Sequence, residues 1–158
     1  MIILKENIVS DQDFIHSFDL NVLGAVRALR LLEEPLKKAQ GSVVLFSSIA
    51  VETGFANHSV IAVAKGAVEG LVRSLAAEWA PAVRVNAIAP SLTKTGIAQP
   101  MTGSEQMASA IAKMHPLQRL GEAEDIATSA KFLMTPDQWI TGQAIHVDGG
   151  RSTIAGKG

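Results

Sequence analysis

Apolar residues near the start of the chain recur at helical spacing and predict a first helix. Ser10 is a suitable N-cap, and Asp13 falls in the first turn. The apolar positions that follow are Phe14, Phe18, Val22, Ala25, Val26 and Leu29. Pro35 is expected to end this helix. A polar turn then precedes the apolar run at residues 43–46, which is typical of a short buried parallel strand.

The longest apolar pattern predicts a helix over residues 59–80. Lys65, Glu69 and Arg73 step by four along one face of it. Its apolar residues line another face: Val60, Ala64, Ala67, Val68, Leu71, Leu75 and Trp79. Residues 83–88 are then predicted to form a strand, which Pro90 closes.

The rest of the chain continues this alternation of helix and strand. The sequence TGSE at 102–105 has capping-box spacing and predicts a short helix running toward Lys113. The remainder of 91–120 is loop-like and long enough to be a lid over a site. A further helix is expected over 122–134, stopped by Pro136, before a last strand at QAIHV and a closing DGG.

Helix and strand alternate throughout, with no repeat or linker between them. This order predicts an α/β fold with helices flanking a small parallel sheet. The length of 158 residues suits one domain and is too short for two ordinary ones, so residues 1–158 are expected to form a single domain.

The composition excludes several classes of protein. Hydrophobic residues make up 47% of the chain and charged residues 18%, which argues against disorder and against a membrane protein. The net charge is -1 and the basic residues are scattered, so no nucleic-acid partner is expected. No apolar run could span a bilayer, and MIIL lacks the marks of a signal peptide, so we expect a cytoplasmic protein. The chain contains neither cysteine nor tyrosine.

Five separated stretches resemble the short-chain dehydrogenase/reductase family. They are NVLGAVRALR from Asn21, GSVVLFSSIA from Gly41, AVAKGAVEGLVRSLAAEWAPAVRVNAIAPSLTKT from Ala62, RLGEAEDIA from Arg119 and WITGQAIHVDGG from Trp139. Five matches in the family's order carry more weight than any single motif. The resemblance implies an oxidoreductase that uses NAD or NADP, built on a partial Rossmann-like, doubly wound parallel sheet of about three strands.

The resemblance is confined to the second half of the family's fold. The glycine-rich turn that follows the family's first strand, and the Asn-Ala-Gly stretch after its fourth, have no counterpart in these residues. We therefore expect the dinucleotide-binding half to be missing. This chain alone is then expected to have no useful affinity for free NAD or NADP, and the residue that would distinguish the two belongs to that half.

The resemblance places three of the family's four catalytic residues in this chain. Ser48 corresponds to the serine that hydrogen-bonds the substrate oxygen. Lys65 corresponds to the lysine that holds the nicotinamide ribose and lowers the pKa of the tyrosine, and Asn21 to the asparagine that organises a proton-relay water. The tyrosine position is Ile61, which cannot transfer a proton, so severely reduced turnover is expected. His58, one helical turn earlier, is either a substitute proton donor or a surface residue at a helix start.

The resemblance also implies a nicotinamide contact after the second strand. Pro90, the backbone of Thr93 and the side chain of Thr95 would flank the carboxamide, and Ser91 stands where the family usually has glycine. The alternative is that APSLTKT is only the exit from a strand. The histidines show no paired ligand spacing, so no metal site is expected. EAED is interpreted as the first turn of a helix and VDGG as a structural turn.

Two functional classes remain open on the sequence. The chain is either an oxidoreductase-family polypeptide, impaired as it stands, that takes a small-molecule substrate under the 91–120 loop, or a non-catalytic half-domain that works by association. Ala62, Gly66 and Gly70 form a stripe of small residues on the long helix, and the equivalent helices pair across subunit interfaces in the family. The edge of the 43–46 strand would also be uncovered, so a homo-oligomer is expected.

Overall fold

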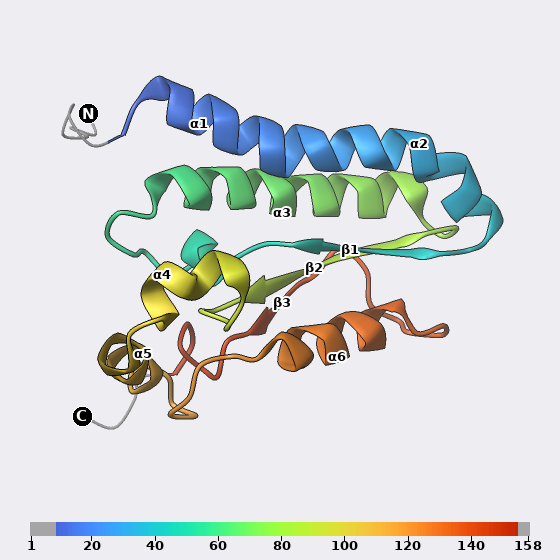
Figure 1. Cartoon of the computed structure of the whole chain (residues 1–158). Helices are drawn as coiled ribbons and strands as arrows, with labels where there is room; N and C mark the ends of the chain where they lie inside the picture. Colours follow the sequence, from blue (N-terminus) through green and yellow to red (C-terminus); the bar gives the residue numbers. More distant parts are fainter. Residues whose placement is uncertain (1–8, 155–158) are drawn as a thin grey trace.

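The computed structural model describes residues 9–154 of the chain. Three parallel strands form one sheet in the order β1-β2-β3, with bounds β1 (Ser42–Phe46), β2 (Arg84–Pro90) and β3 (Ala144–Val147). Helices lie on both sides of it, with α1, α2 and α3 on one side and α6 on the other (Figure 1). The predicted α/β fold with a small parallel sheet is confirmed.

The first helical region is longer and less regular than its pattern predicts. It comprises α1 (Asp11–Phe18), a π-helical segment η1 (Asp19–Leu23) and α2 (Gly24–Lys38). Ser10 caps α1 as predicted, because its hydroxyl accepts a hydrogen bond from the backbone N–H of Asp13. The prediction that Pro35 ends the helix is wrong. Pro35 stands in the last turn of α2, where it removes one backbone donor, and its carbonyl still accepts from Ala39 N at 3.0 Å.

The long helix α3 (Ser59–Trp79) packs against the sheet and agrees with the predicted 59–80 within one residue. Its buried apolar residues are Ala64, Val68, Val72, Ala76 and Trp79. Glu69 is also buried, at 5% exposure, although its spacing groups it with Lys65 and the exposed Arg73. The reason is a partner far away in sequence: the Ser47 hydroxyl donates to Glu69 Oε1 at 2.6 Å.

The central strand β2 is the core of the molecule. Val85, Ala87, Ile88 and Ala89 have no exposed surface. The buried polar side chain in this strand, Asn86, is satisfied, because it donates to Ile140 O at 2.9 Å and accepts from Gln143 N at 3.1 Å. A strand covered on both faces in this way is typical of a parallel sheet between helices.

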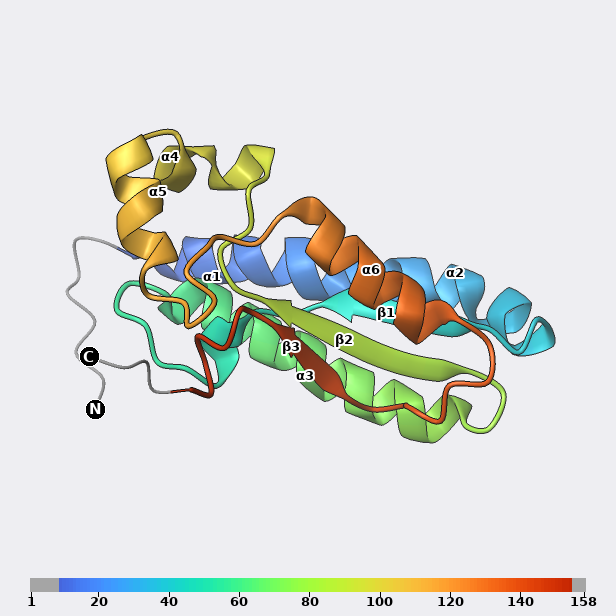
Figure 2. The same ribbon diagram turned by 90° about the horizontal axis from the view of Figure 1, so that it is seen from below.

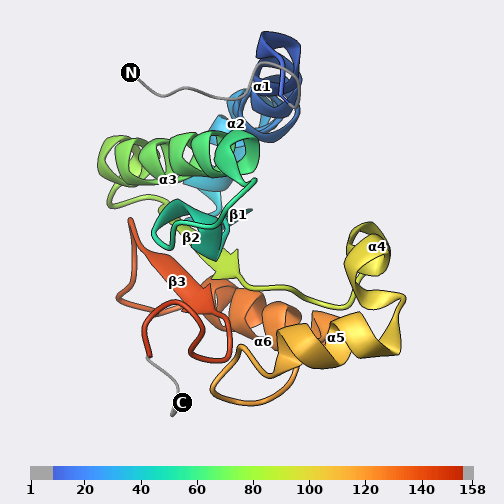
Figure 3. The same cartoon turned by 90° about the vertical axis from the view of Figure 1, so that its left-hand side faces the viewer.

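The segment after β2 contains more helix than the loop-like sequence predicts. It includes η3 (Gly96–Ala98), α4 (Gln99–Thr102) and α5 (Glu105–Ala112). Figure 2 shows α4 and α5 beyond the end of the sheet, and Figure 3 shows them displaced to one side of its strands. The capping-box prediction at Thr102 is wrong: Thr102 donates its hydroxyl proton to Ala98 O at 3.1 Å, and Ser104 caps α5 instead.

The last helix, α6 (Ala123–Met134), begins after an N-cap at Glu122 and ends before Pro136, as predicted. The EAED sequence forms its first turn, with the Asp125 carboxylate accepting from Glu122 N at 2.8 Å. The VDGG sequence forms a turn after β3, in which Asp148 accepts from Gly150 N at 2.8 Å. In the described part of the chain, no helix combines the length and the apolar composition that crossing a bilayer requires.

Candidate functional site

The carboxyl ends of β1 and β2 lie side by side and define the candidate site. Phe46 pairs with Ile88 across the two strands, and Ser47 N donates to Ile88 O at 2.7 Å. Ligands of open parallel sheets bind outside these strand ends. The residues that follow β1 and β2 are therefore placed to line one site.

Ser48 lies directly beyond β1 and is half-buried. It is the N-cap of the short helix η2 (Ile49–Val51), and its hydroxyl oxygen accepts from Ala50 N at 3.2 Å. This bond occupies an oxygen lone pair and leaves the hydroxyl proton for another acceptor. Ser48 could therefore donate to a ligand oxygen.

Lys65 reaches from α3 to the same place. Its Nζ donates to Phe46 O at 2.8 Å, two residues before Ser48 in the chain. Burial lowers the pKa of this amine from its ordinary value of 10.5, because the charged form loses part of its hydration. The structure thus brings the predicted lysine to the loop that carries the predicted serine.

Ile61 occupies the position one turn before Lys65 on α3, and it is half-buried. It brings no ionisable group to this face of the helix. His58, the N-cap residue of α3, is exposed, and its ring lies 5.5 Å from the ring of Phe55. Its Nδ1 lies 2.8 Å from Ala56 O. The exposed position of His58 agrees with the second interpretation of this residue, a surface residue at a helix start.

Asn21 lies in the π-helical segment η1, which packs against α3. Its Nδ2 donates to Ser17 O at 2.9 Å, one turn back in the same helical region. Single π-helical turns are frequent at functional sites. Among residues 9–154, the Asn21 side chain thus bonds within its own helical region and not to Ser48 or Lys65.

The proposed nicotinamide contacts follow β2. Pro90 is the last residue of the strand, and Thr93 forms an isolated parallel bridge with Gly121. A side chain at position 121 would place a Cβ only 2.9 Å from Thr93 Oγ1, so the close approach requires glycine. Thr95 is exposed, and its hydroxyl lies 3.4 Å from Thr93 O. The bridge fixes Thr93 and leaves Thr95 at the surface.

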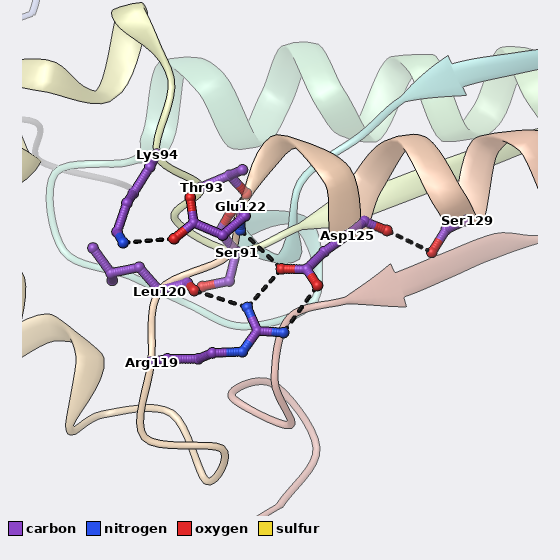
Figure 4. Close-up of polar contacts among 8 residues, drawn as sticks. All are labelled: Ser91, Thr93, Lys94, Arg119, Leu120, Glu122, Asp125 and Ser129. Atoms are coloured by element: carbon purple, nitrogen blue, oxygen red, sulfur yellow. Dashed lines mark hydrogen bonds and ion pairs between the residues drawn. The ribbon is translucent and has the colours of Figure 1, made fainter.

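Ion pairs fasten this segment to the start of α6 (Figure 4). Arg119 binds Asp125 through two bonds, of 2.6 and 2.9 Å, and Lys94 binds Glu122 at 2.5 Å. The hydrogen bond from Arg119, followed by that from the Glu122 backbone, lowers the pKa of Asp125 to about 2. The segment after β2 is therefore held at both Thr93 and Lys94.

A cavity of about 550 Å³ lies next to these ion pairs, between the ends of β2 and β3 and the start of α6. Ser91 and His115 both line it, and the distance from Ser91 Oγ to His115 Nε2 is 2.8 Å. No motif spacing joins these two residues, and their pairing was not predicted. The one signal was Ser91 itself, which replaces the family's usual glycine. Among residues 9–154, His, Asp and Glu side chains do not gather in threes as a metal site would require.

Comparison with known proteins gives a consistent result. Residues 5–152 match the family described as enoyl-(acyl carrier protein) reductase. A tropinone reductase homolog of Arabidopsis thaliana is 34% identical over 145 residues, which are 89% of this chain and 54% of the relative. The short-chain reductase NovJ of Streptomyces niveus is 35% identical over 151 residues, covering 90% of this chain and 57% of NovJ. The chain thus spans about half the length of these curated relatives.

Solved structures agree with the sequence matches. The ligand-free aldohexose dehydrogenase of Thermoplasma acidophilum has a TM-score of 0.88 at 30% identity, covering 96% of this chain and 64% of the dehydrogenase. ElxO with NADP bound has a TM-score of 0.84 at 31% identity, covering 91% of this chain and 60% of ElxO. The five motifs occur in the family's order, the family match covers most of this chain, and the structural neighbours agree. The chain therefore belongs to the short-chain dehydrogenase/reductase family.

Proposed function

We propose that this chain supplies the substrate-facing half of an NAD(P)-dependent oxidoreductase site in which proton transfer is impaired. The observation that carries the proposal is the Lys65 amine beside the Ser48 loop, with Ile61 one turn earlier where the family has an acid. In this proposal, residues 1–158 act as one cytoplasmic domain on a small-molecule substrate, without nucleic acid or membrane as partner.

Each residue has a defined part in the proposal. Ser48 donates its free hydroxyl proton to the substrate oxygen. Lys65 exchanges the Phe46 carbonyl for the hydroxyls of a nicotinamide ribose, and Asn21 orders a water. Ile61 gives the developing alkoxide no proton, and a placed acid-base group contributes about 100- to 10,000-fold to rate. Turnover should therefore be reduced by a factor in this range.

Pro90, Thr93 and Thr95 would flank the carboxamide of NAD or NADP. NADP in the related ElxO structure supports the cofactor class. The fixed bridge between Thr93 and Gly121 supports a preformed contact at this position. The glycine-rich turn has no counterpart in residues 1–158, so we expect this chain alone to bind neither cofactor usefully. Calorimetric titration with NADPH tests this, and micromolar binding would contradict it.

A fusion tests the role of position 61. The N-terminal half of a structural relative would be joined ahead of α1, and the fusion would be compared with its Ile61→Tyr variant. Both should bind NADPH, and the tyrosine variant should reduce carbonyl substrates at least about 100-fold faster. His58→Gln is the matched control and should leave the rate unchanged. Equal rates for Ile61 and its variant would contradict the proposal.

Exposed apolar surface supports the second candidate, association without catalysis. β1 is an edge strand of the described sheet, and α1, η1 and α2 expose Ile15, Leu20 and Leu31 at 60%, 68% and 81%. A Cβ built on Gly70 meets no atom within 4 Å, so the small-residue stripe is open there. We propose a homo-oligomer, since uncovered edges and apolar patches favour association. Analytical ultracentrifugation should detect a species larger than the monomer, and a monodisperse monomer would contradict the proposed homo-oligomer.

A further inference from the structure

We propose that Ser91 and His115 form a nucleophile and base that hydrolyse small carboxylic esters in the cavity at the end of β2. Ser91 is the first residue after the strand, and His115 follows α5. The distance from Ser91 Oγ to His115 Nε2 is 2.8 Å, which is within reach for proton transfer. Ser91 lies between Pro90 and Thr93, which the proposed nicotinamide contact uses, but the hydrolysis needs no cofactor and does not depend on position 61.

The hydrogen bonds of His115 determine which nitrogen acts as the base. Its Nδ1 lies 2.9 Å from Ile111 O, and a carbonyl oxygen can only accept, so Nδ1 carries the proton. In the neutral ring, Nε2 is therefore the acceptor, and the Ser91 hydroxyl donates to it. His115 is only 1% exposed, which holds the ring in this orientation. A nucleophile, a base and a group that orients the base are the three parts of an activated serine.

The backbone beside Ser91 supplies groups for the developing oxyanion. Among residues 9–154, the N–H groups of Leu92 and Thr93 donate no hydrogen bond, and both residues line the cavity. The N–H of the residue after a nucleophilic serine is a common donor to the oxyanion. Such preorganised donors stabilise the negative charge of a tetrahedral intermediate.

The cavity suits a small ester. Its volume of about 550 Å³ lies within the range of ligand pockets. Leu92, Leu117 and Val147 give it apolar walls, and Thr128 and Ser129 lie at α6. The lining also includes charged or titratable side chains: Arg119, Glu124, Asp125, His146 and Asp148. This mixture fits a short acyl chain with a small alcohol.

The reaction balances without any further reactant except water. Ser91 Oγ attacks the ester carbonyl carbon as its proton moves to His115 Nε2. The bond from carbon to the alcohol oxygen then breaks, and the alcohol leaves with the proton from Nε2. Water, deprotonated by the same nitrogen, attacks the acyl-serine. The carboxylic acid leaves and Ser91 regains its proton.

The test uses the whole chain with p-nitrophenyl acetate as substrate and phenylmethylsulfonyl fluoride as inhibitor. The inhibitor should form one adduct, located at Ser91 by peptide mass spectrometry, and hydrolysis should stop. Ser91→Ala and His115→Gln should each lower the hydrolysis rate about 100-fold or more. Ser109→Ala, which changes an exposed serine of α5, is the matched control and should keep the rate.

Two results would overturn the proposal: an adduct on a residue other than Ser91, or a Ser91→Ala variant as fast as the wild type. Circular dichroism of each variant shows whether it is folded. Because Ser91→Ala leaves the buried Nε2 of His115 without its partner, the variant could lose stability. The adduct on the unmodified protein remains decisive in that case, since it needs no variant.

Discussion

Two serines follow the ends of neighbouring parallel strands and have opposite hydrogen-bond roles. Ser48, beyond β1, accepts from Ala50 N and has Ile61 where its family places an acid. Ser91, beyond β2, donates toward a buried imidazole. The serine that the family resemblance assigns to catalysis is thus matched with an isoleucine at the acid position, while the proposed nucleophile outside the family pattern contacts an imidazole.

The comparison indicates that two serines beyond neighbouring strands can have different hydrogen-bond partners, and that these partners, more than the strand end itself, distinguish the two sites. Both serines follow the carboxyl end of a strand, and this is the edge of a parallel sheet at which ligands bind. At the first site, the Lys65 amine donates to Phe46 O, two residues before Ser48 in the chain. His115 gives the second site an oriented base.

The largest expected effect comes from the strand that both regions share. Ile88→Ala removes a side chain with no exposed surface from the centre of β2, where its carbonyl also holds Ser47 N. The free energy of unfolding should fall by about 2–5 kcal/mol in urea denaturation. Ile97→Ala, at 92% exposure, should change it little. Equal effects would contradict the position of β2 as the core.

His115→Phe should have the next largest effect on stability. The substitution leaves the Ser91 hydroxyl without its partner, whereas Ile111 O keeps its bond from Met114 N, and a buried unsatisfied polar group costs about 1–3 kcal/mol. His58→Phe should change the free energy of unfolding by less than about 0.5 kcal/mol, because His58 is exposed. Urea denaturation of both variants separates the two histidines, and equal losses would place His115 at the surface.

A smaller effect should appear in the pH dependence of stability at Lys65. Burial lowers the folded-state pKa of this amine below 10.5, so the unfolded chain binds its proton more tightly. Stability should therefore rise as the pH increases through the window below 10.5, and the rise should disappear in Lys65→Met. Denaturation curves at several alkaline pH values measure this. An identical pH dependence in both proteins would show that the amine is fully hydrated.

The smallest effect is expected at Asp125, which is paired with Arg119 at the surface. Its folded-state pKa is about 2, against an ordinary 3.8, so its stabilising contribution is complete above 3.8 and is lost as the pH falls toward 2. Asp125→Asn should remove this part of the acid sensitivity. Added salt should weaken the effect in the wild type, because exposed ion pairs are screened. A salt-independent difference would contradict the exposed pair.

Periodic segments were predictable from the sequence, whereas long-range polar pairs were not. The α3 helix and the three strands follow from runs of apolar residues whose spacing is unambiguous. The burial of Glu69 depends on Ser47, and the pairing of Ser91 depends on His115; each partner is more than 20 residues away in the chain. No local pattern encodes such pairs.

The candidate site was predictable to a similar degree. The family resemblance assigned Ser48 and Lys65 to one site, and in the structure the Lys65 amine donates to Phe46 O, two residues before Ser48. The bond of Asn21 to Ser17 O depends on a π-helical turn, which propensity does not signal. The roles of these residues, and those of Pro90, Thr93 and Thr95, stay predictions.

The most direct measurement compares the two serines in one reaction. The chain has no cysteine, so Ser48→Cys and Ser91→Cys each introduce a single thiol, and iodoacetamide alkylation at neutral pH reports its reactivity. The His115 imidazole lies within hydrogen-bond distance of position 91, whereas among residues 9–154 the Lys65 amine donates to Phe46 O and not to Ser48. The thiol at position 91 should therefore react roughly tenfold faster than that at position 48. Equal rates, or a faster reaction at position 48, would contradict an activated nucleophile beside His115.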